Sequence, residues 1–319
     1  MKSTKLPLFV SVLLILAVAL SACTPKAPAE KVTIRLGLLP VLDVLPMVVA
    51  QQEGLFAAHN LNVEIIPVAS APERDQLIAA GQADGIMNEL TSVLFLNKDS
   101  QRVQAIRFAR TATAEQPLFS LVSGKASQLT AVEQLKGQPI GISQGTIIEY
   151  VTDKLLDQAG FNAGDKNFVP VPKIPDRLAL LGKGDLKAAT LPEPFVSMSV
   201  AQGDTVLLDD TSLPEASFSV ITFRVDFLQQ HPEAAKAFLA AVEEAVKLIN
   251  DTPDKFSSLM VDQKMVPANL GTSFKVPSYP TAGVPSEAQF NDVRDWLRVK
   301  GYLSSDQNYA QAVNSSFLP

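Results

Sequence analysis

Five short segments of this 319-residue chain carry polar side chains of the kinds that bind small molecules. Each segment follows an apolar run with a strand pattern: 39–43, 87–91, 109–113, 143–146 and 191–195. In open α/β sheets the binding crevice lies beyond the carboxyl ends of the strands, so we expect these segments to converge. The candidate ligand-binding residues in them are Leu39, Asp43, Asn88, Glu89, Arg110, Ser143, Gln144, Gly145, Thr146, Glu193 and Phe195.

The charges in these segments favour a ligand that carries N–H donors. Asp43, Glu89 and Glu193 recur at strand ends, and Arg110 is the only basic residue in the five segments. Three carboxylates would repel a simple anion, whereas a protonated amine or a nitrogen heterocycle fits this balance. Each carboxylate taken singly can instead cap a helix and face solvent.

The Ser-Gln-Gly-Thr turn at 143–146 precedes a long helical pattern. Such a turn offers backbone N–H groups at the positive end of a helix, and the hydroxyl of Ser143 or Thr146 can donate to a ligand oxygen. Ordinary N-capping by Ser or Thr predicts the same residues at this place, so both interpretations stay open. Phe195 adds an aromatic ring on which a ligand can stack.

Catalytic chemistry finds little support in the sequence. The two histidines, His59 and His231, lie in loop-like stretches without the partner spacing of a metal site or a Ser-His-Asp arrangement. No G-x-S-x-G, P-loop or paired-cysteine motif occurs. We therefore expect no catalytic residue, no metal and no cofactor. The net charge of −6 argues against a nucleic-acid partner, for which a basic patch is expected.

The elements that must position these residues alternate between strand and helix. Helical stretches between the strands predict parallel pairing in an α/β sheet. Strand patterns occur at 31–39, 61–68, 83–87, 103–109, 139–143 and 168–172, and helical patterns at 46–56, 73–81, 91–97, 145–160 and 176–182.

Two of these units resemble each other. In each, an Asp (Asp75 or Asp176) precedes a Gly by six residues, and a short strand then ends at Glu89 or Glu193. Any helix–Gly–strand corner can give this pattern, with the Gly as a helix C-cap. Together with the alternation in both halves, it favours two lobes of similar construction that face each other.

The only cysteine, Cys23, lies at the end of a secretory-signal pattern. Two lysines precede an apolar run at 8–20, which is too short for a comfortable membrane-spanning helix. The sequence Leu-Ser-Ala-Cys at 20–23 resembles a bacterial lipobox, so we predict a signal peptide at 1–22 and a lipid on Cys23, followed by a tether to residue 30. The alternative is a plain signal peptide followed by an incidental free cysteine.

Several longer stretches resemble one protein family. They are Q-Q-E-G-L-F-A-A-H-N-L-N-V-E-I (51–65), A-A-G-Q-A-D-G-I (79–86), L-K-G-Q-P-I-G-I-S (135–143) and F-S-V-I-T-F-R-V-D-F-L-Q-Q-H-P-E-A-A-K-A-F (218–238). In these the chain resembles the periplasmic-binding-protein-like solute receptors of ABC importers. The branch is the one that includes sulfonate-, nitrate- and thiamine-precursor-binding proteins.

The resemblance implies a type II fold: two lobes, each a mainly parallel sheet flanked by helices, with a hinge of two crossings. Lobe one would take residues 31–118, lobe two 119–216, and residues 217–319 would return to lobe one and add C-terminal helices. The implied function is capture of a small solute by hinge closure and delivery to an ABC permease driven by its ATPase. The chain would then be an exported monomer, anchored to a bacterial membrane through Cys23, and not an enzyme.

Two alternatives remain beside this reading. One is an exported enzyme of the same fold that resembles menaquinone-pathway proteins, and the other is a receptor for a simple anion such as sulfonate or nitrate. The thiamine-precursor branch typically has a Trp soon after its first strand, and none occurs here. Trp296, the single Trp, lies in a late helical pattern whose spacing indicates core packing.

Overall fold

A computed structural model describes residues 31–263, 265–271 and 274–319 of the chain. The predicted signal peptide, Cys23 and the tether lie outside the described residues. Over the ranges that are described, none of the helices combines the length and the apolar character that spanning a bilayer requires.

The first of two five-stranded sheets has the strand order β2-β1-β3-β10-β4. β1 pairs in parallel with both β2 and β3, whereas β10 pairs antiparallel with β3 and β4. Four strands therefore run in one direction and β10 runs against them. The strands are β1 (Val32–Leu38), β2 (Leu61–Pro67), β3 (Gly85–Asn88), β4 (Val103–Thr111) and β10 (Phe218–Arg224).

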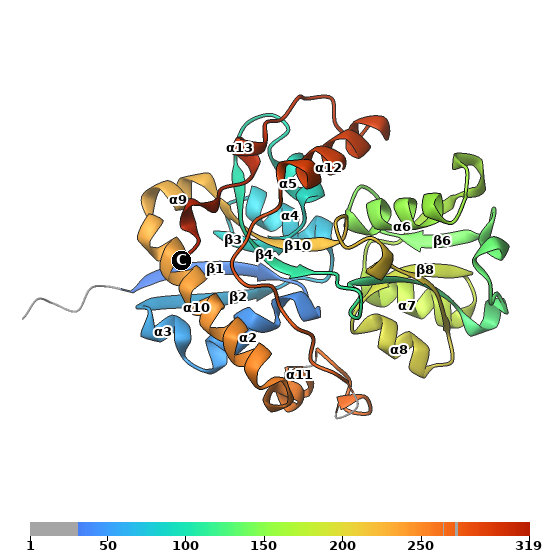
Figure 1. The fold of residues 1–319 in the computed structure, drawn as a ribbon, viewed down its shortest axis with the longest axis horizontal. Helices are drawn as coiled ribbons and strands as arrows, with labels where there is room; N and C mark the ends of the chain where they lie inside the picture. The colour runs from blue at the N-terminus through green and yellow to red at the C-terminus, as the bar shows by residue number, and fades with distance from the viewer. Residues whose placement is uncertain (1–30, 264, 272–273) are drawn as a thin grey trace, which may run out of the picture. The chain divides into compact units, whose positions relative to one another are not determined.

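The second sheet repeats this arrangement in the order β7-β6-β8-β5-β9. β6 pairs in parallel with β7 and β8, and β5 pairs antiparallel with β8 and β9. In both sheets the first strand after the chain has crossed between them, β10 or β5, takes the fourth place. It runs antiparallel to the other four strands. The two mainly parallel sheets that we expected are thereby confirmed (Figure 1). The strands are β5 (Phe119–Ser123), β6 (Pro139–Ile142), β7 (Asn167–Pro170), β8 (Ala188–Pro192) and β9 (Thr205–Asp209).

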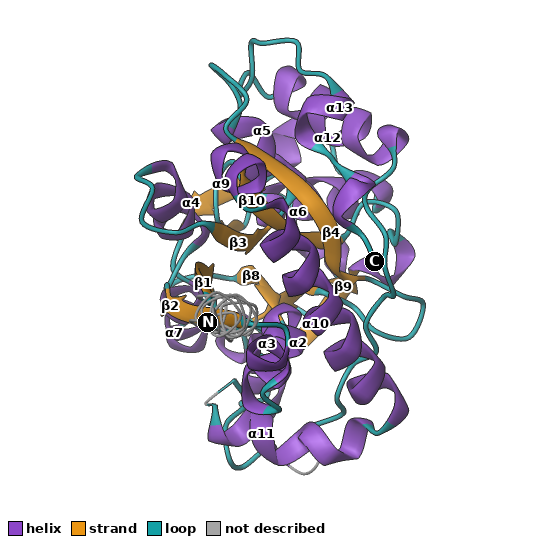
Figure 2. Ribbon diagram, turned by 90° about the vertical axis from the view of Figure 1, so that its left-hand side faces the viewer, coloured by secondary structure: helices purple, strands orange, loops and turns teal. Residues whose placement is uncertain are grey.

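Helices surround the strands of both sheets (Figure 2). Most of them bury one apolar face: in α12, for example, Phe290, Val293 and Trp296 face the core, as their spacing predicted. The helices of the described chain are α2 (Leu45–Gln52), α3 (Leu55–Ala58), α4 (Ala71–Ala79), α5 (Leu90–Leu96), α6 (Ile147–Gln158), α7 (Ile174–Lys183), α8 (Phe195–Ala201), α9 (Val225–Gln230), α10 (Pro232–Asp251), α11 (Ser257–Asp262), α12 (Glu287–Val299) and α13 (Tyr309–Ala312).

One buried carboxylate, Asp210, links the two crossings between the sheets. It accepts the backbone N–H groups of Leu118 and Phe119, both at 3.0 Å, on the outgoing crossing. It also accepts the hydroxyl of Ser217 on the returning crossing. Burial raises the pKa of Asp210 to about 6, although these three donors act in the opposite direction.

Candidate functional site

A cavity of about 40 Å³ lies beyond the carboxyl ends of strands from both sheets. From the predicted set it brings together Leu39, Asp43, Glu89, Ser143 and Thr146, so the expected convergence holds for these five. The full lining is Leu39, Val41, Asp43, Ala71, Arg74, Met87, Glu89, Phe119, Ser143, Thr146, Ile147, Ile148, Pro172, Ile174, Arg177 and Pro192.

The most unusual side chain in this cavity is Arg177, from the first turn of α7. Its side chain is fully buried, and Nη1 donates to the carbonyl of Val171 at 3.1 Å. Its Nε and Nη2 atoms have no hydrogen-bond partner within the part of the chain that the structure describes. Burial lowers the pKa of Arg177 to about 9, so the guanidinium is still protonated at neutral pH. The cavity wall therefore contains a buried cation with two donors that are unpaired among the described residues.

A second buried guanidinium, that of Arg74, reaches the cavity from α4 but is fully paired. Its Nε donates to Asp75 at 2.9 Å, and Nη2 donates to Glu89 at 3.1 Å. Its Nη1 contacts the carbonyl of Met87 at 3.1 Å. Burial opposes the charge of Arg74, and the two carboxylates more than offset it, so its pKa is raised. Arg74 thus has its counter-charges within the protein.

The two arginines occupy equivalent places in the two sheets. α4 begins Ala-Pro-Glu-Arg and α7 begins Ile-Pro-Asp-Arg, so each arginine is the fourth residue of the helix after the second strand of its unit. Both helices are followed by a glycine with positive φ, Gly81 at 70° and Gly184 at 81°. In this structural match, Arg177 is the equivalent of Arg74, and Leu178 is the equivalent of Asp75.

The repeat predicted from the sequence was out of register by two residues. It paired Asp75 with Asp176 and Gly81 with Gly182, but Gly182 lies inside α7 and Gly184 ends that helix. With the pairing wrong, the equivalence of the arginines was hidden. The signal that reveals it is a Pro at the second helical position followed two residues later by Arg.

The three carboxylates that favoured an amine ligand are already bonded. Asp43 accepts the hydroxyl of Ser219 at 2.6 Å and lies 3.8 Å from a guanidinium nitrogen of Arg110. Glu89 accepts from Arg74, yet its pKa is raised because burial outweighs that partner. The carboxylate of Glu193 bonds Ser197 in the first turn of α8 and is absent from the cavity lining.

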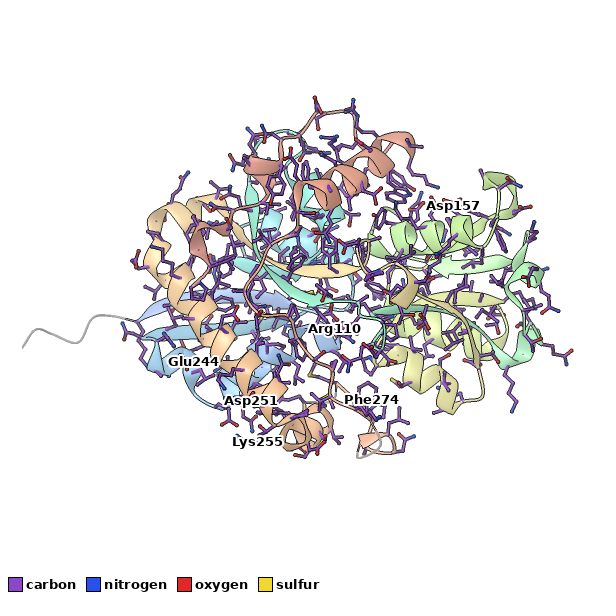
Figure 3. All side chains as sticks on the ribbon, viewed as in Figure 1. Arg110, Asp157, Glu244, Asp251, Lys255 and Phe274 are labelled. Atoms are coloured by element: carbon purple, nitrogen blue, oxygen red, sulfur yellow. The ribbon has the colours of Figure 1, made fainter. Side chains whose placement is uncertain are left out.

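Glu193 and Arg110 line a different pocket. Glu193 accepts the backbone N–H and the hydroxyl of Ser197, at 3.2 and 3.1 Å, and burial raises its pKa. Arg110 lies at the end of β4, where Figure 3 labels it, and donates to the carbonyl of Pro117 at 3.0 Å. Both residues line a pocket of about 260 Å³ that also includes Phe274.

The turn at 143–146 is mostly satisfied within the protein. Thr146 is the N-cap of α6, accepting the N–H of Ile148 at 3.2 Å and donating to the carbonyl of Ser143 at 2.8 Å. The N–H of Gly145 donates to Glu149 at 2.7 Å, and that of Thr146 donates to the carbonyl of Ser143 at 3.3 Å. Two of the backbone donors that we expected to be free are therefore taken. The hydroxyl of Ser143 differs, because it is buried in the cavity wall without a hydrogen-bond partner among the described residues.

The other predicted residues lie outside this cavity. Asn88 is fully buried and bonds Ser92 and Thr222, which indicates a structural role. The amide of Gln144 donates to the hydroxyl of Tyr302 at 3.0 Å. Phe195 lines a neighbouring groove.

Chemically, the cavity is suited to an oxyanion. Arg177 offers two donors and a positive charge, Ser143 offers a hydroxyl, and the charges of Arg74 and Asp43 are balanced by partners. Within the described ranges, no three His, Cys, Asp or Glu side chains are grouped to hold a metal ion.

Comparison with known proteins identifies related chains. The model of the NMT1-like family matches residues 27–259. A Haemophilus influenzae protein whose name assigns it provisionally to thiamine biosynthesis is 29% identical over 148 residues, 46% of each chain. The nitrate/nitrite-binding protein NrtA of a Nostoc species is 24% identical over 257 residues, 74% of this chain and 57% of NrtA. The chain therefore spans about half the length of these curated relatives.

Solved structures show the same fold. The alkanesulfonate-binding protein SsuA of Xanthomonas axonopodis, bound to MOPS, superposes with a TM-score of 0.76 over 90% of this chain and 99% of SsuA. At 15% identity this likeness shows the fold alone. The fold is that of the type II periplasmic binding proteins.

Proposed function

Because the chain belongs to the NMT1-like family and has the type II periplasmic-binding-protein fold, we propose that it captures a small solute outside the cytoplasm for an ABC importer. The solute carries an anionic group such as a carboxylate, sulfonate or phosphate. This group binds in the cavity of about 40 Å³ between the two sheets.

The observation that carries this proposal is the buried, unpaired guanidinium of Arg177. A buried charge is strongly disfavoured unless it is paired, and two donors of Arg177 lack partners in the described chain. An oxyanion supplies the missing charge and accepts from Nε and Nη2, with the hydroxyl of Ser143 as a third donor. The equivalent Arg74 needs no such ligand, because Asp75 and Glu89 neutralise it.

The cavity wall supports capture by hinge closure. Arg177 and Ser143 come from elements of the second sheet, whereas Leu39 and Glu89 follow strands of the first. A solute that contacts both groups favours the closed arrangement by its extra contacts there. The closed protein then docks on a membrane permease with a cytoplasmic ATPase.

The membrane attachment is part of the same proposal. The Leu-Ser-Ala-Cys sequence at 20–23 supports a lipid on Cys23, which keeps an exported monomer near its permease. In this role the protein delivers a solute and catalyses no reaction.

The amine or nitrogen heterocycle suggested by the strand-end carboxylates is no longer favoured. Asp43, Glu89 and Glu193 each have a donor inside the protein, so none of them is left unpaired for a cationic ligand.

A thermal-shift screen of the purified protein tests the proposal. The panel holds carboxylates, sulfonates, phosphates and nitrate, with amines and neutral compounds of matched size. We expect at least one anion to raise the melting temperature of the wild type, because a ligand that binds only the folded state stabilises it. Arg177→Met should abolish the shift.

The Arg177→Met and Glu89→Gln variants distinguish an anionic ligand from a cationic one. A shift produced only by amines, and lost in Glu89→Gln, would contradict the anion proposal and restore the cationic one. An anion-induced shift that survives in Arg177→Met would place the anion elsewhere.

A further inference from the structure

An apolar groove of about 530 Å³ lies directly beside the small cavity. Its volume falls in the range of about 300–1,000 Å³ that is usual for small-molecule sites. Most of its walls are aliphatic or aromatic. The lining residues are Leu38, Leu39, Pro40, Val44, Val48, Gln51, Gln52, Ile65, Pro67, Val68, Ala69, Glu73, Ile174, Pro175, Phe195, Gln263 and Met265.

The groove and the cavity share a wall. Leu39 and Ile174 line both of them. Ile174 and Arg177 are three residues apart on α7, so they lie on the same face of that helix. A molecule bonded to Arg177 would enter the groove if it extended past Ile174.

The volumes of the cavity and the groove indicate that they hold different parts of one solute. A water molecule needs about 10–15 Å³ of such volume, so a cavity of about 40 Å³ holds a group of only about three or four non-hydrogen atoms. That is the size of a carboxylate or sulfonate head. Any larger part of the solute must lie in the groove.

The charges along the groove restrict the rest of the solute. None of the described residues that line it is basic, so a second anionic group would find no counter-charge among them. Its single carboxylate, that of Glu73, accepts the backbone N–H of Ala69 at 2.9 Å. The polar lining residues are otherwise glutamines.

We propose that the solute is an amphiphilic monoanion whose head binds Arg177 and Ser143 and whose uncharged apolar tail lies in the groove. This inference rests on the proposed function, because the head group is the anion assigned there. It adds that inorganic anions are poor ligands and that affinity comes largely from the tail.

Titration calorimetry with ethane-, butane-, hexane- and octanesulfonate tests the inference on the wild-type protein. Burial of each methylene should tighten binding by about fourfold until the groove is filled. Nitrate should bind more weakly than any of the long sulfonates. Equal affinity for ethane- and octanesulfonate, or tighter binding of nitrate, would overturn the tail assignment and leave the anion receptor standing.

A matched pair of variants locates the tail. Ile65 on the edge strand β2 lines the groove and is 37% exposed, and Val206 on the edge strand β9 lies outside it and is 38% exposed. We expect Ile65→Gln to weaken octanesulfonate several-fold with little effect on ethanesulfonate, whereas Val206→Gln should change neither. Equal effects of the two substitutions would contradict the assignment of the tail to the groove.

The experiment tests the assignment of the anionic head and the assignment of the apolar tail separately. Arg177→Met should weaken sulfonates of every length by a similar factor, because it removes the head contact alone. If hexylamine or hexanol binds as tightly as hexanesulfonate, the anion proposal is wrong. If no sulfonate of any length binds, the series is repeated with alkyl carboxylates. Binding of acetate with no gain in affinity for longer chains removes the tail assignment alone, and no binding of any carboxylate, sulfonate or phosphate removes the proposed function as well.

Discussion

Replacing Arg177 by Met should stabilise the protein in the absence of solute. The wild type keeps a protonated guanidinium fully buried with two unpartnered donors, and this arrangement has a cost that only a bound anion offsets. Met has a similar length, no charge and flexible packing, so it can fill the same space. The predicted result is a more stable protein that binds anions much more weakly.

The magnitude follows from the pKa of Arg177. Its fall from 12.5 to about 9 corresponds to about 5 kcal/mol at about 1.4 kcal/mol per pH unit, which is an upper bound on the gain. The substitution also frees the carbonyl of Val171, which is half-buried, so its loss costs at most about 1–3 kcal/mol, the penalty for an unsatisfied buried acceptor. The net expectation is a gain of at most about 2–4 kcal/mol.

Urea unfolding at pH 7, in a buffer without carboxylate, sulfate or phosphate, measures this change. Arg74→Met is the matched control, since it makes the same substitution at the equivalent place in the other sheet. There the change leaves Asp75 and Glu89 without their cation and should destabilise the protein by about 3–5 kcal/mol.

The contrast between the two variants is the critical result. If Arg177→Met is destabilised like Arg74→Met, then Arg177 has a counter-charge in the unliganded protein and the argument for an anion is wrong. If an anion found in the screen stabilises the wild type but not Arg177→Met, the binding and stability measurements agree.

The remaining predictions concern the crossings, the helix cap and the anchor. Folding raises the pKa of Asp210 from 3.8 to about 6, which corresponds to a contribution of about 3 kcal/mol to the free energy of unfolding. This contribution is full below pH 3.8 and is lost as the pH rises through 6. Asp210→Asn should remove this slope from urea midpoints measured between pH 4 and 7, and equal slopes in both proteins would refute the assignment. Thr146→Ala should cost about 1 kcal/mol through loss of the α6 N-cap, with Thr146→Ser restoring it; complete loss of anion binding would instead make Thr146 a ligand contact. Cys23→Ala should move the protein from the membrane fraction to the soluble fraction, and retention on the membrane would contradict the lipid anchor.

The secondary structure was largely predictable because its signals are local. Apolar spacing located β1 to β4, β6 and β7 and the helices between them, with boundaries within a few residues. β9 was missed: it is an edge strand, and its residues 205–209 are half-buried or exposed, so no alternation marks them.

The convergence of the strand ends was also predictable. Asp43, Glu89 and Ser143 were expected at one place from the rule for open α/β sheets alone, and they line one cavity. That rule points only to residues that follow strands, however, whereas Arg74 and Arg177 stand in the first turns of helices. The two residues that dominate the charge of the site were therefore absent from the candidate set.

The sequence by itself determined the alternation of strands and helices, the two similar units and the strand ends that form the site. Only the tertiary structure decided which charges are paired. Glu89 follows β3 and turns toward Arg74, whereas Glu193 follows β8 at the equivalent place and turns away to cap α8. Pairing depends on the direction of each side chain across elements distant in the chain, and Leu178 also stands where Asp75 does. Arg74 is therefore paired with two carboxylates, whereas Arg177 has no such partner among the described residues.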